Sequence, residues 1–224
     1  MLEELKEKIK DKSLVIFGEI HGTKEIPELL SRFFVEIAKD EEFNICFEIP
    51  TEFQEKISLF MRNGDDNLLR NSSFFSKNKF KDGRNSIEYL NLIKSLYDIN
   101  LKNKMNIEVF CIDSIANNQK EKEEGLAENI LKSLQNKKTF AILGSIHASK
   151  KPIQFKGIYI IPAGNILFKK LNNKMFNINI LPNKGHFFNF GIKKIVGDYN
   201  KHFNEGFDYI LKIEHITPCS FLKD

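Results

Sequence analysis

Two short stretches of the sequence end in the same pattern, in which a histidine follows a glycine by three positions directly after an apolar run. The first stretch, VIFGEIH, ends at His21, and the second, FAILGSIH, ends at His147. With 12 glycines and 5 histidines among 224 residues, chance supplies only about 0.3 such spacings. Glycine lets the chain turn sharply off a strand, so each imidazole can point back over the sheet edge. The repeated pattern therefore indicates that the two histidines belong to one site.

Carboxylates accompany these histidines. Glu19 lies inside the first pattern, and Glu48 lies in CFEIP between two apolar residues, where a carboxylate is costly to bury without a charged partner. Two imidazoles and two carboxylates that meet at one place suit a divalent metal ion or an acid–base set that activates water. The predicted catalytic residues, which are also the predicted ligands if a metal is bound, are Glu19, His21, Glu48 and His147.

Two further charged residues are candidates for binding the substrate. Arg84, in DGRNS, precedes a predicted helix, where a guanidinium beside a helix N-terminus can hold a carboxylate or phosphate through two parallel hydrogen bonds. Asp113 closes the apolar run NIEVFCID. We predict that both residues bind substrate. The alternatives are an ordinary loop arginine and an ordinary turn aspartate, since acids often end strands as turn residues.

Other reactive side chains receive structural interpretations. The histidines interpreted as structural or surface residues are His186, His202 and His215. Glu123, in KEEGLAENI, is interpreted as a solvated charge on a helix. Cys46 and Cys111 lie within apolar runs, which is typical of small buried side chains and not of catalytic thiols.

Apolar periodicity predicts the elements that position the candidates. Short runs rich in β-branched residues predict strands, and apolar stripes that repeat every three to four residues predict helices. The predicted strands are 13–19, 44–50, 106–113 and 139–145, and the main predicted helices are 26–37, 86–101 and 121–134. A strand, a helix and a second strand in close succession form a parallel βαβ unit. The carboxyl ends of such strands converge on a crevice that binds ligands.

The predicted fold class is α/β, with a mainly parallel central sheet, flanking helices and mixed or antiparallel C-terminal strands. We expect one domain over residues 1–224, with a core over 13–150 and a β-rich part over 151–224. Asn85 is the predicted N-cap of the second main helix. The polar stretch before it, which includes the basic run Lys77 to Arg84, is predicted to form a loop and short turns.

Composition limits the classes of partner. Lysines and acids are interleaved along the chain and the net charge is only +4, which argues against nucleic-acid binding. The longest apolar runs have strand length, and the N-terminal MLEELKEKIKDK has no signal-peptide pattern. Three cysteines without a C-x-x-C pair are typical of reduced thiols. We therefore expect a cytoplasmic protein with a small-molecule or peptide substrate and no nucleic-acid or membrane partner.

Several motifs together resemble a known superfamily. FGEIHGTKEIP, FEIP, DGRNS, FCID, KEEGLAENI and LGSIHA, spread over residues 13–150, are similar to motifs of the superfamily that contains ChaN-like haem-binding lipoproteins, Tiki/TraB proteins and erythromycin-esterase-like hydrolases. In that superfamily paired G-x-x-H motifs and a nearby glutamate form the active or metal site. The resemblance places these roles on His21, His147, Glu19 and Glu48. Its members include metal-dependent proteases, an esterase that uses His and Glu without a required metal, and haem binders.

The sequence departs from this superfamily in two respects. Where relatives often carry an Arg-Asp-x-x-Met-Ala helix start, residues 122–127 read KEEGLA, which questions an arginine contribution from that helix. We also expect no lipoprotein leader, because neither a signal-peptide pattern nor a lipobox cysteine is present, and this disfavours haem binding.

These observations favour a hydrolase of ester or amide bonds. In the leading mechanism the histidines hold a divalent metal or polarise a water, and a carboxylate takes the proton. The alternative is a haem- or metal-binding protein that uses the same histidines as ligands without turnover. A signalling or interaction module with a degenerate site is a third, less favoured interpretation, because the set of ionisable residues is complete.

The pairing of the two histidines leads to a first prediction. His21→Ala and His147→Ala should each lose most activity, and the double variant should be little worse than either, because groups that act as one unit are strongly non-additive. Steady-state rates of the three variants measure this. His186→Ala and His202→Ala are the controls and should stay near wild type. Full multiplicative loss in the double variant would place the two histidines in separate sites.

Overall fold

The computed structural model describes residues 2–76, 82–135, 137–155, 157–195 and 201–222. The α-helices are α1 (Leu2–Ile9), α2 (Glu25–Ile37), α3 (Gln54–Asn63), α4 (Asn67–Arg70), α5 (Ile87–Asn103), α6 (Gln119–Ser133), α7 (Ser145–Ala148) and α8 (Ala163–Leu171). The strands are β1 (Leu14–Glu19), β2 (Phe43–Pro50), β3 (Glu108–Asp113), β4 (Lys138–Gly144), β5 (Ile153–Phe155), β6 (Ile158–Ile160), β7 (Met175–Phe188), β8 (Ile192–Lys194) and β9 (Tyr209–Ile216). Short 3-10 turns span Thr51–Phe53, Asn172–Lys174 and Lys201–Gly206. Residues 77–81 of the predicted basic loop lie outside the described residues.

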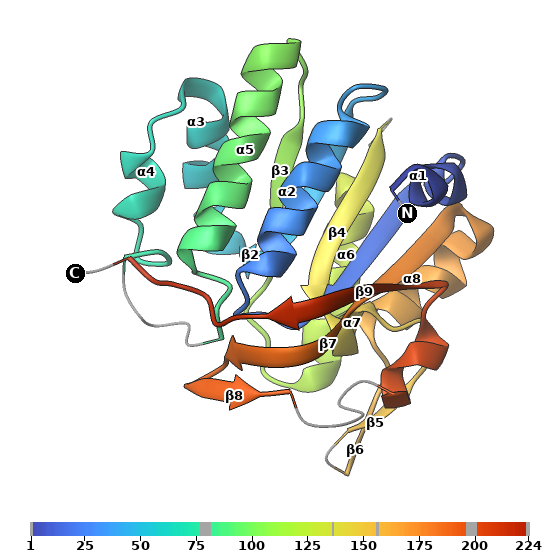
Figure 1. The fold of residues 1–224 in the computed structure, drawn as a ribbon. Helices are drawn as coiled ribbons and strands as arrows, with labels where there is room; N and C mark the ends of the chain where they lie inside the picture. Colours follow the sequence, from blue (N-terminus) through green and yellow to red (C-terminus); the bar gives the residue numbers. More distant parts are fainter. Residues whose placement is uncertain (1, 77–81, 136, 156, 196–200, 223–224) are drawn as a thin grey trace.

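The central sheet has the strand order β3-β2-β4-β1-β7, with β8 and β9 both paired to β7 (Figure 1). The parallel strands are β3, β2, β4, β1, β7 and β9, and β8 runs antiparallel to β7. β5 and β6 form a separate antiparallel pair. The predicted α/β class, with a mainly parallel sheet and mixed C-terminal strands, is confirmed.

Helices cover both faces of this sheet, with α2 and α5 on one face and α6 and α8 on the other (Figure 1). β1 is buried along its whole length, so its residues alternate between two apolar cores. Val15 and Phe17 pack in the larger core with α2 and α5, whereas Leu14 and Ile16 pack in the smaller core with α6 and α8. Burial on both faces explains why this strand is apolar throughout and not alternating.

Aromatic packing ties α2 to the sheet. The ring centroid of Phe140, on β4, lies between 5.3 and 6.2 Å from the centroids of Phe17, Phe33, Phe34 and Phe43. Most of these contacts are edge-to-face, the geometry that aromatic quadrupoles favour. The cluster therefore packs helix α2 against the three adjacent strands β2, β4 and β1.

Two local predictions need correction. The N-cap of α5 is Ser86, whose Oγ accepts the backbone N–H of Tyr89 at 3.2 Å. The predicted cap, Asn85, is buried and donates its side-chain amide to the Phe74 carbonyl at 3.1 Å. Both residue types cap helices, so only the helix start decides between them. Helix α8 was not predicted, because its nine residues directly follow a β-like run.

Strand order brings the two glycine–histidine patterns together. β1 and β4 are parallel neighbours, and Glu19 lies opposite Gly144 in their register. β2 flanks β4 on its other side. Figure 1 shows α7, which follows β4, at the end of the sheet toward which the β4 arrow points. Within the described ranges, each helix is too short or too polar to cross a membrane.

Candidate active site

His21 is held by the carboxylate that ends β1. Its Nδ1 donates to Glu19 Oε1 at 2.7 Å, and the hydroxyl of Tyr89, on α5, donates to the same oxygen. The Glu19 side chain is fully buried, while that of His21 is 15% exposed. Gly22 follows with a φ of +81°, and a Cβ there would lie only 1.9 Å from the Phe188 carbonyl oxygen. This turn, which only glycine fits, brings the chain off the strand directly after the imidazole.

His147 has an equivalent arrangement, built from a different part of the chain. Its Nδ1 donates to Glu123 Oε1 at 2.7 Å, and Glu123 Oε2 accepts the backbone N–H of Ala163 at 2.8 Å. Glu123 is 1% exposed, so its interpretation as a solvated charge was wrong. We call Glu19 with His21 the first pair, and Glu123 with His147 the second pair.

The sequence did contain a signal for Glu123. The buried residues of α6 include Leu126, Ala127 and Ile130, which lie three, four and seven positions after Glu123. These spacings place Glu123 on the apolar stripe that faces the sheet. A carboxylate on such a stripe requires a buried partner, and His147 is that partner. Tyr89, by contrast, had no distinguishing pattern in the sequence.

Glu48, on β2, lies between the two pairs. Its Oε2 is 3.4 Å from His21 Nε2, and its Oε1 is 3.8 Å from His147 Nε2. The backbone N–H of Gly144 donates to Oε2 at 3.0 Å. Both imidazoles thus bind a buried carboxylate through Nδ1 and turn Nε2 toward one shared carboxylate. The predicted proximity of the two histidines is confirmed.

Two cations also approach Glu48. Arg84 Nη1 lies 3.2 Å from Glu48 Oε1, and Lys122 Nζ lies 3.6 Å from the same oxygen. Both cations contact Asp113, Arg84 at 2.8 Å, and Arg84 also binds Asp82 at 2.8 Å. Lys122 therefore supplies a cation from the helix where an arginine contribution was in question. Substrate binding by Arg84 and Asp113 stays a prediction.

These contacts set the protonation of the site. Burial alone would lower the pKa of His21, but its hydrogen bonds to Glu19 and Glu48 outweigh burial and raise the pKa to about 10. Burial likewise opposes protonation of His147, yet the charge of Glu48 and the bond to Glu123 raise its pKa. Burial would raise the pKa of Glu48, but the charges of His147 and Arg84 hold it well below its usual range. At neutral pH the site therefore holds a proton on His21 and a negative charge on the central carboxylate of Glu48.

Gly144 keeps the space between the imidazoles open. A Cβ at this position would lie 3.2 Å from His21 Nε2, 3.5 Å from His147 Cδ2 and 3.8 Å from Glu48 Oε2. The backbone conformation of Gly144, with φ of −57° and ψ of 141°, is open to any residue. The role of glycine here therefore lies in the space that it leaves beside His21 and not in its backbone freedom.

The other histidines and two of the cysteines were interpreted as structural or surface residues. His186 and His215 are exposed on β7 and β9, and the side chain of His202 lies outside the described part of the structure. Cys46 and Cys111 are buried, and burial raises the pKa of each thiol to about 12. Both therefore remain neutral thiols, as the sequence predicted.

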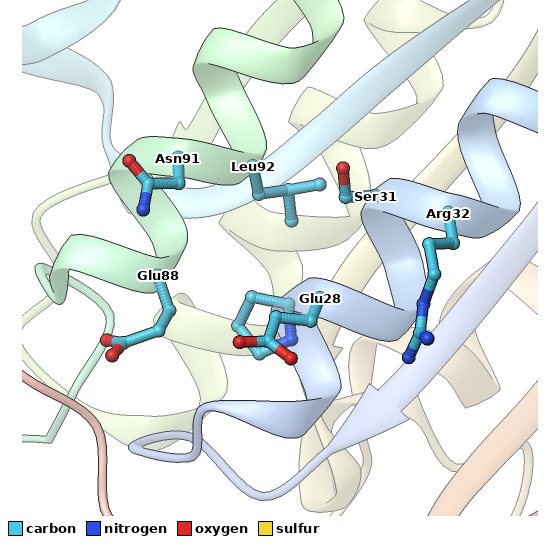
Figure 2. A pocket seen from close by; sticks show the side chains of 7 residues that line it. Glu28, Ser31, Arg32, Glu88, Asn91 and Leu92 are labelled. Carbon is cyan, nitrogen blue, oxygen red and sulfur yellow. The ribbon is translucent and has the colours of Figure 1, made fainter.

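A separate pocket of ≈ 330 Å³ lies between α2 and α5. Figure 2 shows Glu28, Ser31 and Arg32 of α2 facing Glu88, Asn91 and Leu92 of α5 across it. None of the residues that line this pocket belongs to either pair or contacts Glu48 in the described structure. The pocket therefore adds no group to the candidate active site.

The donor set does not fit a divalent metal. Among the residues that the structure describes, no group of three or more His, Cys, Asp or Glu side chains is arranged to hold a metal ion. The physical reason lies at Glu48, where Arg84 and Lys122 already stand within 4 Å of the carboxylate and would repel a dication. The predicted ligands were Glu19, His21, Glu48 and His147, and they do lie together. The cations beside the central carboxylate, however, are the side chains of Arg84 and Lys122.

Fold and site together define an α/β protein with two His–Glu pairs around a buried glutamate at the carboxyl ends of parallel strands. No protein-family model matches the chain, and no curated protein matches its sequence. Solved structures do match. A succinoglycan biosynthesis protein superposes with a TM-score of 0.75 at 13% identity, over 98% of this chain and 92% of its own.

Two further matches have more informative descriptions. A mutant of erythromycin esterase EreC, in its open conformation, gives a TM-score of 0.64 at 10% identity, over 86% of this chain and 78% of its own. ChaN of Campylobacter jejuni, described with cofacially bound haem, gives a TM-score of 0.53 at 14% identity, over 80% of this chain and 85% of its own. The resemblance seen in the motifs is thus confirmed at the level of the fold, which this chain shares with EreC and ChaN.

The raised pKa of His21 predicts how stability depends on pH. The folded protein binds the imidazolium proton more tightly than the unfolded chain does, so this contribution is complete below about pH 6.5. It is lost as pH rises toward the folded-state pKa of about 10. The free energy of unfolding from urea titrations should therefore fall over this range, and the fall should be smaller in His21→Gln. The exposed His215 supplies the control, since His215→Gln should keep the wild-type slope; an equal slope in all three proteins would contradict the pKa assignment.

Proposed function

We propose that this protein is a hydrolase that cleaves an ester or amide bond by general acid–base catalysis, without a required metal ion. The observation that carries the proposal is the shared geometry of the two pairs. Each imidazole donates Nδ1–H to a buried carboxylate at 2.7 Å, and each Nε2 lies within 4 Å of Glu48. A carboxylate on Nδ1 fixes the tautomer and orientation of a histidine, which leaves Nε2 to exchange protons with a reacting group.

The two histidines have different roles in this proposal. His21 has the closer contact with Glu48 and a pKa of about 10, so it holds a proton at neutral pH and serves as the general acid. Glu48 and Glu123 raise the pKa of His147 as well, but its Nε2 lies further from Glu48 and the charge of Lys122 opposes the rise. We therefore assign His147 as the general base, which acts in its neutral form. Environments that separate two titratable groups in this way assign the acid and base roles at neutral pH.

The reaction then follows in balanced steps. Neutral His147 takes a proton from water at Nε2 while the water oxygen bonds to the carbonyl carbon, and the charged ring of His21 stabilises the oxyanion. The carbon–oxygen or carbon–nitrogen bond breaks as His21 gives its proton to the leaving group. Glu48, which lies between the two Nε2 atoms, returns the proton from His147 to His21. Because its pKa is held low, Glu48 passes protons on without retaining them.

Haem binding is the alternative function, and it is supported by the fold that this chain shares with ChaN. An axial iron ligand needs a neutral imidazole with a free nitrogen lone pair. In this chain both Nδ1 atoms donate to carboxylates, and both Nε2 atoms face Glu48. Iron bound at either Nε2 would keep the Nδ1–H bond to the carboxylate but would separate that Nε2 from Glu48 and remove an imidazolium that compensates its buried charge. These contacts favour hydrolysis over haem ligation.

A substrate panel tests the proposed function. The purified protein should hydrolyse at least one member of a panel of activated esters and chromogenic peptides, and the rate should survive EDTA. Metal analysis should find no stoichiometric divalent metal, and added haem should give no sharp absorbance band. A rate that EDTA abolishes and zinc restores would contradict the metal-free mechanism. A stoichiometric haem band without turnover would establish the alternative.

Glu123 offers a sharper test of the second pair. Glu123→Gln keeps the shape of the side chain but cannot hold the imidazolium of His147, so kcat should fall by about 10²-fold or more while KM changes little. Glu124→Gln is the matched control, because Glu124 is the next residue on the same helix, is exposed and pairs with Lys120 at 3.8 Å. It should retain the wild-type rate. Equal rates for the two variants would remove Glu123 from the mechanism.

A further inference from the structure

Two buried asparagines on β7 have no role in the reaction described above. Asn177 and Asn179 are both fully buried, and residues two apart on a strand point to the same face of the sheet. Asn177 Oδ1 has no hydrogen-bond partner within the described structure. A buried amide with an open oxygen costs about 1–3 kcal/mol, so stability alone would favour an apolar residue at this position. A specific contact must account for the amide.

Both asparagines bind the short helix that carries His147. Asn177 donates Nδ2–H to the backbone carbonyl of Ala148, and Asn179 Oδ1 accepts the hydroxyl of Ser145 at 3.0 Å. Ser145 and Ala148 are the first and last residues of α7. The sheet therefore fastens this helix at both ends, with His147 between the two attachments.

Helix α7 also contacts the first pair, through the backbone of Glu19. Ser145 Oγ lies 3.2 Å from the backbone carbonyl oxygen of Glu19, so one hydroxyl lies within hydrogen-bond distance of acceptors on β1 and β7. The methyl group of Ala148 packs closely over Gly18, where an added Cβ would approach it to 3.0 Å. The position of His147 relative to His21 thus depends on contacts from β1 and β7 to α7.

α7 cannot hold His147 in place by itself. It is a single turn of four residues with no side-chain hydrogen bond at its N-cap, and isolated turns of this length are unstable because helix nucleation is unfavourable. Rotation of the turn would move Nε2 of His147 away from Glu48. Displacements of about 1 Å at a reacting group can lower a rate by about 10²-fold.

We propose that Asn177 and Asn179 are positioning residues, which hold α7 so that His147 bonds to Glu123 and faces Glu48. Their effect on rate rests on the proposed hydrolysis, whereas their effect on the His147 hydrogen bond does not. The C-terminal third, in which the sequence predicted only strands of uncertain role, then contributes directly to the geometry of the active site.

The experiment compares Asn179→Ala with Asn183→Ala. Asn183 lies on the same strand but is exposed and donates to Glu214 at 2.8 Å, at the surface. In Asn179→Ala we expect kcat to fall by about 10-fold or more with KM within about twofold, because the base is displaced while binding groups remain. In histidine-labelled protein, the downfield Nδ1–H resonance of His147 should shift or vanish, while that of His21 persists. Asn183→Ala should match wild type in both measurements.

Ser145→Ala keeps the test decisive if the asparagine variants do not fold. It removes the hydroxyl that reaches Asn179 on β7 and the Glu19 carbonyl on β1, and it should produce the same change in the His147 resonance. An unchanged His147 resonance in the folded variants would overturn the proposal, even if the rate fell. If the wild-type protein hydrolyses nothing, the proposed function fails, and the resonance alone still decides whether β7 positions His147.

Discussion

A carboxylate that is 6% exposed, as Glu48 is, keeps its charge only if cations and hydrogen-bond donors replace the water that it has lost. In this protein His21 and His147, which follow the ends of β1 and β4, approach its two oxygens, and Arg84 and Lys122 lie close to one of them. Each of these cations has at least one further carboxylate partner. Each charge in this cluster therefore stabilises the others, because loss of any one of them would leave another buried charge without compensation. The geometry of the site follows from this constraint.

The two His–Glu pairs are alike in contacts and different in origin. Glu19 is two residues from His21 on the same strand end, whereas Glu123 reaches His147 from a helix that precedes β4. The pairs therefore differ in their surroundings, with Lys122 close to the second pair and Tyr89 bound to the first. Unequal surroundings give unequal affinities for a proton, and two imidazoles with unequal affinities can serve as an acid and a base at the same pH.

Prediction from the sequence succeeded where the pattern is local and failed where a partner lies far along the chain. Glu48 was recognised because apolar neighbours on both sides make its charge expensive at any place in the fold. Glu123 was missed because charged residues surround it in the sequence, and only its spacing from the buried face of α6 marks it as internal. The cap of α5 was misplaced by one residue, at Asn85 and not at Ser86, because both residue types favour the N-cap position.

The sequence by itself determined the α/β class, the parallel core strands and the presence of histidines and carboxylates at their ends, because hydrophobic periodicity and strand-end positions are local properties of the chain. The tertiary structure alone decided the strand order that places β4 between β1 and β2, and with it the meeting of His21, His147 and Glu48. It also decided that cations occupy the surroundings of Glu48 and that Glu123 binds His147. These outcomes depend on contacts between residues tens of positions apart, which no local pattern encodes.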